Sequence, residues 1–76
     1  MSAMTFAVET EDGEETVVVD TDELLGDLTP GEFMLLMAYV ERSGLDRERA
    51  MAGGHVLVLL SRKIDADHES LLEAVI

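Results

Sequence analysis

The segment LTPGEFMLLMAYVERSG predicts a helix with clearly marked ends. Thr29 and Glu32 have the spacing of a capping box, in which each side chain accepts a hydrogen bond from the other residue's backbone N–H, and Pro30 occupies the first helical position. Gly44 is placed to end the helix in the left-handed conformation. The pattern therefore predicts a helix from about Pro30 to Ser43.

This predicted helix carries eight consecutive apolar residues, more than the single apolar stripe of a surface helix requires. At 100° per residue, the stripe that we expect to face the core contains Phe33, Leu36, Met37 and Val40. The residues around the remaining circumference are Met34, Leu35, Ala38 and Tyr39. Because a chain of 76 residues has few other elements to enclose a helix, we expect this second set to form a partner-binding or self-association surface. Burial of all eight residues in the core is the alternative.

The amino-terminal part has runs rich in Thr and Val, which favour a pleated surface. The runs MTFAVET and ETVVVD, residues 4–10 and 15–20, are separated by an acidic stretch that contains Asp12 and Gly13. An Asp-Gly pair between two such runs is typical of a hairpin turn of a primed type. The pattern predicts a β-hairpin, one face of which must lie on the helical part or extend the sheet of a neighbour.

The segment DRERAMAGGHVLVLLSRKI fits two interpretations. HVLVLL after two glycines is compatible with a buried strand, and a Gly pair inside a helix costs about 2 kcal/mol. We expect a helix, because Gly53 shares a stripe with Leu57 and Leu60, where a missing side chain lets this helix approach the first one closely. Val56, Val58 and Leu59 lie outside that stripe, so a second helix also carries surplus apolar surface.

A last short helix follows, capped by Asp65 or Asp67. The apolar residues that it buries are Leu71, Leu72 and Val75. The patterns together predict an α+β fold, with an N-terminal β-hairpin followed by a small bundle of about three helices. We expect a single domain, residues 1–76, in which residues 1–28 form the acidic hairpin and linker and residues 29–76 form the helical part.

Charge is distributed unevenly along the chain, whose formal net charge is −12. Residues 1–41 hold eleven acids and no Lys or Arg, whereas the basic residues all lie from Arg42 onward. Such a field repels phosphate backbones, so we expect no direct binding to nucleic acid, and a basic protein surface is the natural partner. A solubilising acidic face is the alternative. The candidate electrostatic contacts are Glu11, Asp12, Glu14 and Glu15.

Candidate catalytic chemistry is scarce. The chain has no cysteine, and its two histidines, His55 and His68, have no nucleophile at motif spacing, so we expect no enzyme and no catalytic residue. DTDELLGDLTPG departs from a calcium loop, because Leu24 and Gly31 occupy ligand positions, and we expect neither metal nor cofactor. The longest apolar run is shorter than the roughly 20 residues that span a bilayer, so we expect an intracellular protein without membrane association.

A combination of features resembles the tail assembly chaperones of long-tailed bacteriophages. It consists of an acidic extended start, the helix opening Leu28-Thr29-Pro30-Gly31-Glu32, a very apolar second helix ending as VLVLLSRK, and an Asp-containing turn before a short helix. Members of that family are small acidic proteins that shield the hydrophobic tape measure protein before the tail tube polymerises around it. The resemblance implies a shielding role for the surplus apolar surface of this chain.

The expected function is that of a non-enzymatic phage assembly protein, which acts in the cytoplasm of the bacterial host and binds a larger structural protein, either a tape measure protein or a capsid subunit. One alternative is a minor capsid or capsid-stabilising protein that remains in the virion. Another is an acidic antitoxin-like or regulatory module, and self-association is also open. The residues expected to bind the partner are Met34, Leu35, Ala38, Tyr39, Val58 and Leu59.

Overall fold

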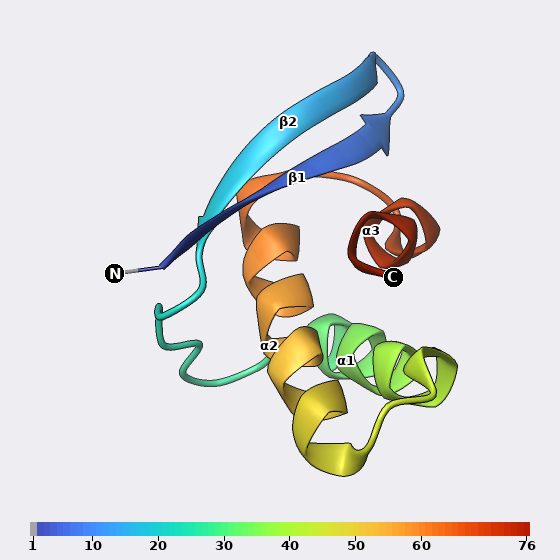
Figure 1. The fold of residues 1–76 in the computed structure, drawn as a ribbon. Coiled ribbons are helices and arrows are strands. Elements are labelled where there is room, and N and C mark those ends of the chain that lie inside the picture. The colour runs from blue at the N-terminus through green and yellow to red at the C-terminus, as the bar shows by residue number, and fades with distance from the viewer. Residues whose placement is uncertain (1) are drawn as a thin grey trace.

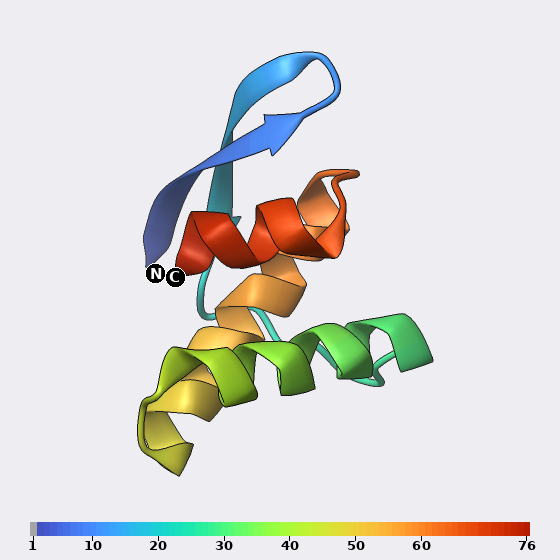
Figure 2. The same cartoon turned by 90° about the vertical axis from the view of Figure 1, so that its right-hand side faces the viewer.

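The structure is a computed structural model that describes residues 2–76, and it contains an antiparallel two-stranded hairpin followed by three helices (Figure 1). The elements are β1 (Ala3–Thr10), β2 (Gly13–Asp20), α1 (Pro30–Ser43), α2 (Arg47–Lys63) and α3 (His68–Val75). The predicted α+β fold class is confirmed. The hairpin lies at one end of the molecule and α1 at the other, and α2 runs between them (Figures 1 and 2).

The hairpin is confirmed, but its turn is not of the primed type. The turn residues are Glu11 and Asp12, and neither has a positive φ, which a primed turn requires at its first central residue. The positive φ, 108°, belongs to Gly13, which pairs with Thr10. Thr10 Oγ1 closes the turn, because it accepts a hydrogen bond from the Asp12 N–H at 3.2 Å and donates to the Gly13 carbonyl at 2.8 Å.

The inner face of the hairpin packs on the helices. Phe6, Val8 and Val19 are buried and belong to the same apolar cluster as the helix residues beneath them. β1 packs on α3, and β2 packs on α2. The predicted need for one hairpin face to be covered is therefore met within the chain.

α1 begins and ends as predicted. Thr29 Oγ1 accepts a hydrogen bond from the Glu32 N–H at 3.1 Å, and Glu32 Oε1 accepts one from the Thr29 N–H at 2.9 Å, which completes the capping box. Gly44 follows in the left-handed conformation, with φ of 68°. A side chain at this φ would strain the backbone, so glycine suits the position.

α2 settles the open question of residues 55–60, which are helical. Two glycines on this helix face α1. A Cβ on Gly53 would stand only 2.6 Å from Cζ of Tyr39, and a Cβ on Gly54 would overlap Cδ1 of Leu36. The close helix approach predicted at Gly53 is confirmed, and Gly54 shares it.

α2 is the central element of the molecule, with α1 against its amino-terminal part and the hairpin and α3 around its carboxyl-terminal part (Figures 1 and 2). Its residues Leu57, Val58, Leu59 and Leu60 are all buried, with exposed fractions of 2 % or less. The prediction that Val58 and Leu59 form surplus surface is wrong. A stretch of helix that is enclosed on all sides is apolar on all sides, so residues 57–60 require no second chain to cover them.

α3 begins at the Asp67 cap, where Oδ1 accepts a hydrogen bond from the Ser70 N–H at 2.7 Å. That hydrogen bond lowers the pKa of Asp67. Leu71 and Leu72 are buried as predicted, whereas Val75 is half-buried. Of the two predicted caps, Asp67 therefore has the capping role.

Candidate functional site

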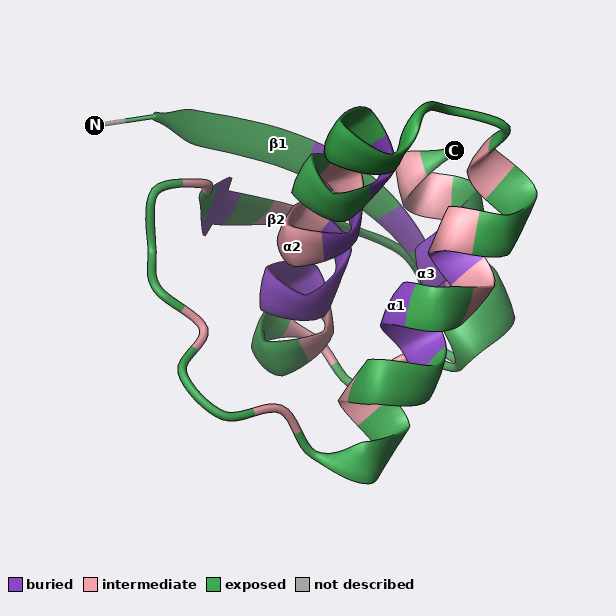
Figure 3. Cartoon of the chain, turned by 90° about the horizontal axis from the view of Figure 1, so that it is seen from below, coloured by how far each residue is buried: buried purple, intermediate pink, exposed green. Residues whose placement is uncertain are grey.

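The main candidate site is an exposed apolar face on α1. Phe33, Met34 and Met37 are exposed by 54, 67 and 41 %, and they lie within about 100° of one another around the helix. We call these three residues the α1 outer face. Figure 3 shows α1 at the surface of the molecule, with its exposed side directed away from α2. An apolar face of this kind is typical of a helix that packs on something outside its own chain.

The opposite side of α1 packs into the molecule. Leu35, Leu36 and Tyr39 are buried, with exposed fractions of 1, 7 and 6 %. Tyr39 and Leu36 lie over Gly53 and Gly54 of α2, where the missing side chains leave room for an aromatic ring and a branched side chain. These glycines determine which side of α1 faces inward.

The side of α1 that was predicted to face the core is therefore largely exposed, and part of the side that was predicted to be exposed faces the core. Phe33 and Met37 were expected in the core and are exposed, and Val40 is half-buried, while Leu36 is buried as expected. Among the residues expected to bind a partner, Leu35 and Tyr39 belong to the core. The prediction that these two residues are exposed is therefore wrong.

The two other α1 residues of that set are less covered than Leu35 and Tyr39. Ala38 is half-buried, and Met34 is the most exposed residue of the α1 outer face. The partner-binding role of Met34 stays a prediction, since its side chain is free to contact another molecule. Val58 and Leu59 could reach a partner only if the core opened.

Hydrogen bonds from α2 fix the position of the α1 start. The Arg62 guanidinium donates to both carboxylate oxygens of Glu32, with Nε 2.6 Å from Oε2, and to the carbonyl oxygens of Leu25 and Asp27. His55 holds the same linker, because its Nε2–H donates to a backbone carbonyl at 2.9 Å. The linker between β2 and α1 is thus attached to α2 at several points.

The charge on Glu32 is strongly stabilised. The hydrogen bond from Arg62, together with the backbone N–H of Thr29, lowers the pKa of Glu32 from 4.5 to about 2. The same pair raises the pKa of Arg62. Only 15 % of the Glu32 side chain is exposed, because Arg62 and the linker cover it. The capping carboxylate therefore also joins α1 to α2.

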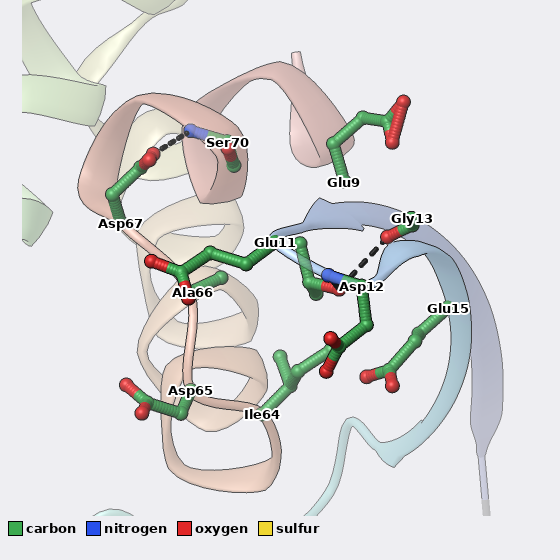
Figure 4. A pocket seen from close by; sticks show the side chains of 11 residues that line it. Glu9, Glu11, Asp12, Gly13, Glu15, Ile64, Asp65, Ala66, Asp67 and Ser70 are labelled. Carbon is green, nitrogen blue, oxygen red and sulfur yellow. Dashed lines mark hydrogen bonds between the residues drawn. The ribbon is translucent and has the colours of Figure 1, made fainter.

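The acids of the hairpin tip lie far from α1, at the other end of the molecule (Figure 1). A cleft of about 940 Å³ separates the hairpin tip from the connection between α2 and α3 (Figure 4). Of the predicted electrostatic contacts, Glu11, Asp12 and Glu15 line this cleft, and Glu14 does not. All four are exposed.

The cleft contains acids that the sequence did not connect with the hairpin. They are Asp65 and Asp67; Glu9 of the hairpin also lines the cleft, and no Lys or Arg does. Among residues 2–76, no group of acidic and histidine side chains has a geometry that could hold a metal ion. The cleft thus presents carboxylates without a counter-charge, which favours a positively charged partner.

A smaller hollow of about 210 Å³ lies between the end of α1 and the end of α3. It is lined by Tyr39, Ser43, Leu45, Val75 and Ile76. Its volume is below the range of about 300–1,000 Å³ that is usual for small-molecule sites. Leu45 and Ile76 are exposed at its rim, by 45 and 64 %, and add apolar surface near the carboxyl terminus.

The arrangement defines a small α+β protein with one exposed apolar helix face and one acidic cleft. No protein-family model, curated protein or solved structure matches the chain. The resemblance to tail assembly chaperones therefore stays a prediction. Among residues 2–76, no helix is both long and apolar enough to cross a membrane.

Proposed function

We propose that the chain is a non-enzymatic protein-binding module that covers an apolar helical segment of a larger phage structural protein through the α1 outer face. The observation that carries the proposal is the exposure of Phe33, Met34 and Met37 on one side of a single helix. Two of these residues are methionines, whose flexible side chains adapt to partners of different shape. The tape measure protein is the partner that the resemblance to tail assembly chaperones implies.

The surroundings of the α1 outer face support reversible shielding. The side of α1 that faces α2 is covered without a partner, since Leu35, Leu36 and Tyr39 are already buried. The module therefore does not need to refold in order to bind or release its target. A net charge of −12 keeps such an exposed apolar face soluble by repelling other copies.

The test is co-expression with the tape measure protein of the same phage, followed by measurement of the soluble fraction and of co-purification. Phe33→Ser and Met37→Ser should each reduce co-purification by at least about fivefold, because each removes an apolar side chain of a size worth 1.5–3 kcal/mol when buried. Val18→Ser is the matched control, because Val18 is exposed by 60 % on the hairpin, away from α1. Equal binding by all three variants would refute the proposal.

The alternative of a capsid-stabilising protein uses the same face on a different partner. Mass spectrometry of purified virions separates the two, since a cement protein is present in stoichiometric amounts and a chaperone is absent from the finished particle. In the chaperone form the protein acts in the host cytoplasm, and in the cement form it stays in the virion.

The acidic cleft supports a second candidate function, an antitoxin-like or regulatory module that binds a basic protein. The cleft gathers Glu11, Asp12 and Glu15 with Asp65 opposite them. Glu11→Gln combined with Glu15→Gln should abolish binding of a basic partner and leave tape measure binding unchanged. Loss of tape measure binding in this double variant would instead assign the cleft to the first function.

A further inference from the structure

The edge of β1 that does not face β2 lies at the opposite end of the molecule from the α1 outer face (Figure 1). Thr21 N–H donates to the Ser2 carbonyl at 2.9 Å, which continues the ladder by one pair beyond Ala3 and Asp20. Hydrogen-bonded and non-hydrogen-bonded pairs alternate along an antiparallel ladder. Ala3, Thr5, Ala7 and Glu9 therefore direct their backbone N–H and C=O groups away from β2.

These backbone groups are available for pairing. Among residues 2–76, the sheet has two strands, and no element other than β2 pairs with β1. Ala3, Thr5 and Ala7 are exposed and small, and no charged residue occurs between Ala3 and Val8. An uncharged free strand edge of this length is a template for another strand.

We propose that β1 pairs with β1 of a second copy in an antiparallel arrangement centred on Phe6, which joins the two hairpins into one continuous sheet. In this register Thr5 lies opposite Ala7 of the second copy, and Ala3 lies opposite Glu9. These are the residues whose N–H and C=O groups point outward, so each pair exchanges two hydrogen bonds. The arrangement is symmetric about a two-fold axis, as in most homodimers.

Charge placement favours β1 over β2 as the dimer edge. In the β1 pairing the two Glu9 side chains stand at opposite ends, roughly 20 Å apart at 3.4 Å per residue, which exceeds the Debye length of about 10 Å at 0.1 M salt. The equivalent pairing of β2 with itself, centred on Val17, sets Glu14 opposite Asp20. Like charges directly opposite each other destabilise a sheet.

The exposure of Met4 supports the same register. Met4 lies on the inner side of the hairpin with the buried Phe6 and Val8, yet it is exposed by 49 %. In the proposed dimer Met4 lies opposite Val8 of the second copy, so the second copy covers it. The β1 pairing therefore completes a partly covered apolar row as well as the backbone hydrogen bonds.

Thr5→Pro tests this proposal, and Thr16→Pro on β2 is its matched control. Both residues direct their N–H away from the hairpin ladder, so proline removes no intramolecular hydrogen bond in either variant. Sedimentation velocity in high salt, which screens the repulsion between copies, should show a concentration-dependent dimer. Thr5→Pro should raise the dimer dissociation constant by at least about tenfold, because the two-fold axis repeats each lost bond, whereas Thr16→Pro should change it less than about twofold.

Amide exchange of the unmodified chain keeps the test valid if a proline variant fails to fold. The N–H groups of Thr5 and Ala7 should gain protection as the concentration rises from micromolar to millimolar, while those of Thr16 and Val18 should not. A monomer at millimolar concentration in high salt would overturn the proposal. A dimer that Phe33→Ser abolishes and Thr5→Pro leaves intact would also overturn it, since the contact would then lie on α1.

Discussion

Gly53→Ala tests the contact that orients α1. A Cβ at this position would lie 2.6 Å from Cζ and 2.7 Å from Cε2 of Tyr39, whereas carbon atoms normally approach to about 3.5–4.0 Å. The rigid ring would have to recede by about 1 Å, although Tyr39 is exposed by only 6 %. Overpacking of this kind costs about 1–3 kcal/mol.

A gain in helix propensity opposes that cost. Alanine is favoured over glycine by about 1 kcal/mol inside a helix, so the net effect of Gly53→Ala should be a loss of roughly 1 kcal/mol. Urea unfolding followed by circular dichroism measures this loss as a lower midpoint at an unchanged slope. Ala52→Gly is the control, because Ala52 is exposed in the same turn of α2 and reports the propensity difference alone.

The sign of the effect should reverse when the ring is removed. In a Tyr39→Leu background, Gly53→Ala should stabilise the chain by about 1 kcal/mol, which gives a coupling energy of about 2 kcal/mol between the two positions. If Gly53→Ala instead stabilises the unmodified chain by as much as Ala52→Gly destabilises it, then α1 and α2 do not approach closely at Tyr39. The assignment of the outer face of α1 would then lose its basis.

Three further outcomes follow from contacts described above. The pKa of Glu32 is lowered in the folded protein, so the unfolded protein binds more protons at this residue between pH 4.5 and pH 2. The contribution of Glu32 to stability is therefore complete above pH 4.5 and disappears as the pH falls towards 2. Glu32→Gln should make the stability of the protein less dependent on pH over this interval, as measured by acid unfolding. Leu60→Ala should cost about 2–5 kcal/mol in urea unfolding, whereas Leu24→Ala, at 89 % exposure, should stay within about 0.5 kcal/mol. Thr29→Ala should cost about 1 kcal/mol, measured in the same way, because it removes the cap of α1.

The two ends of α1 and the helical state of α2 were predictable from the sequence, whereas the type of the hairpin turn was not. The capping box at Thr29 and Glu32 and the left-handed Gly44 depend on residues within a few positions of one another, and all are present as predicted. The helical state of residues 55–60 followed from the position of Gly53 relative to Leu57 and Leu60. Such short-range signals carry most of their information in the sequence itself.

The faces of the helices were not predictable in the same way. Every residue from Phe33 to Val40 is apolar, so the sequence of α1 offers no polar side to orient it. The orientation comes from Gly53 and Gly54, which accept Tyr39 and Leu36, and a prediction that paired these glycines with large residues on α1 would have found it. Likewise, the enclosure of α2 depends on the hairpin and α3 folding back over it.

The acidic cleft also depends on long-range folding. Asp65 and Glu11 are distant in the sequence, and only the return of the α2–α3 connection to the hairpin tip brings them to one cleft. The sequence indicated a strong negative charge in the amino-terminal half but not this concentration of it. The cap residue Asp67 lines the same cleft.

The central place of α2 has a consequence for how the molecule responds to load and heat. The hairpin packs on α2 and α3, while α1 packs mainly on α2. Unfolding of α2 as a whole should therefore release both ends of the protein in a single cooperative transition. A partner bound to α1 can move the hairpin only by displacing α2. A ligand at one end of the molecule should therefore change the structure of the other end very little.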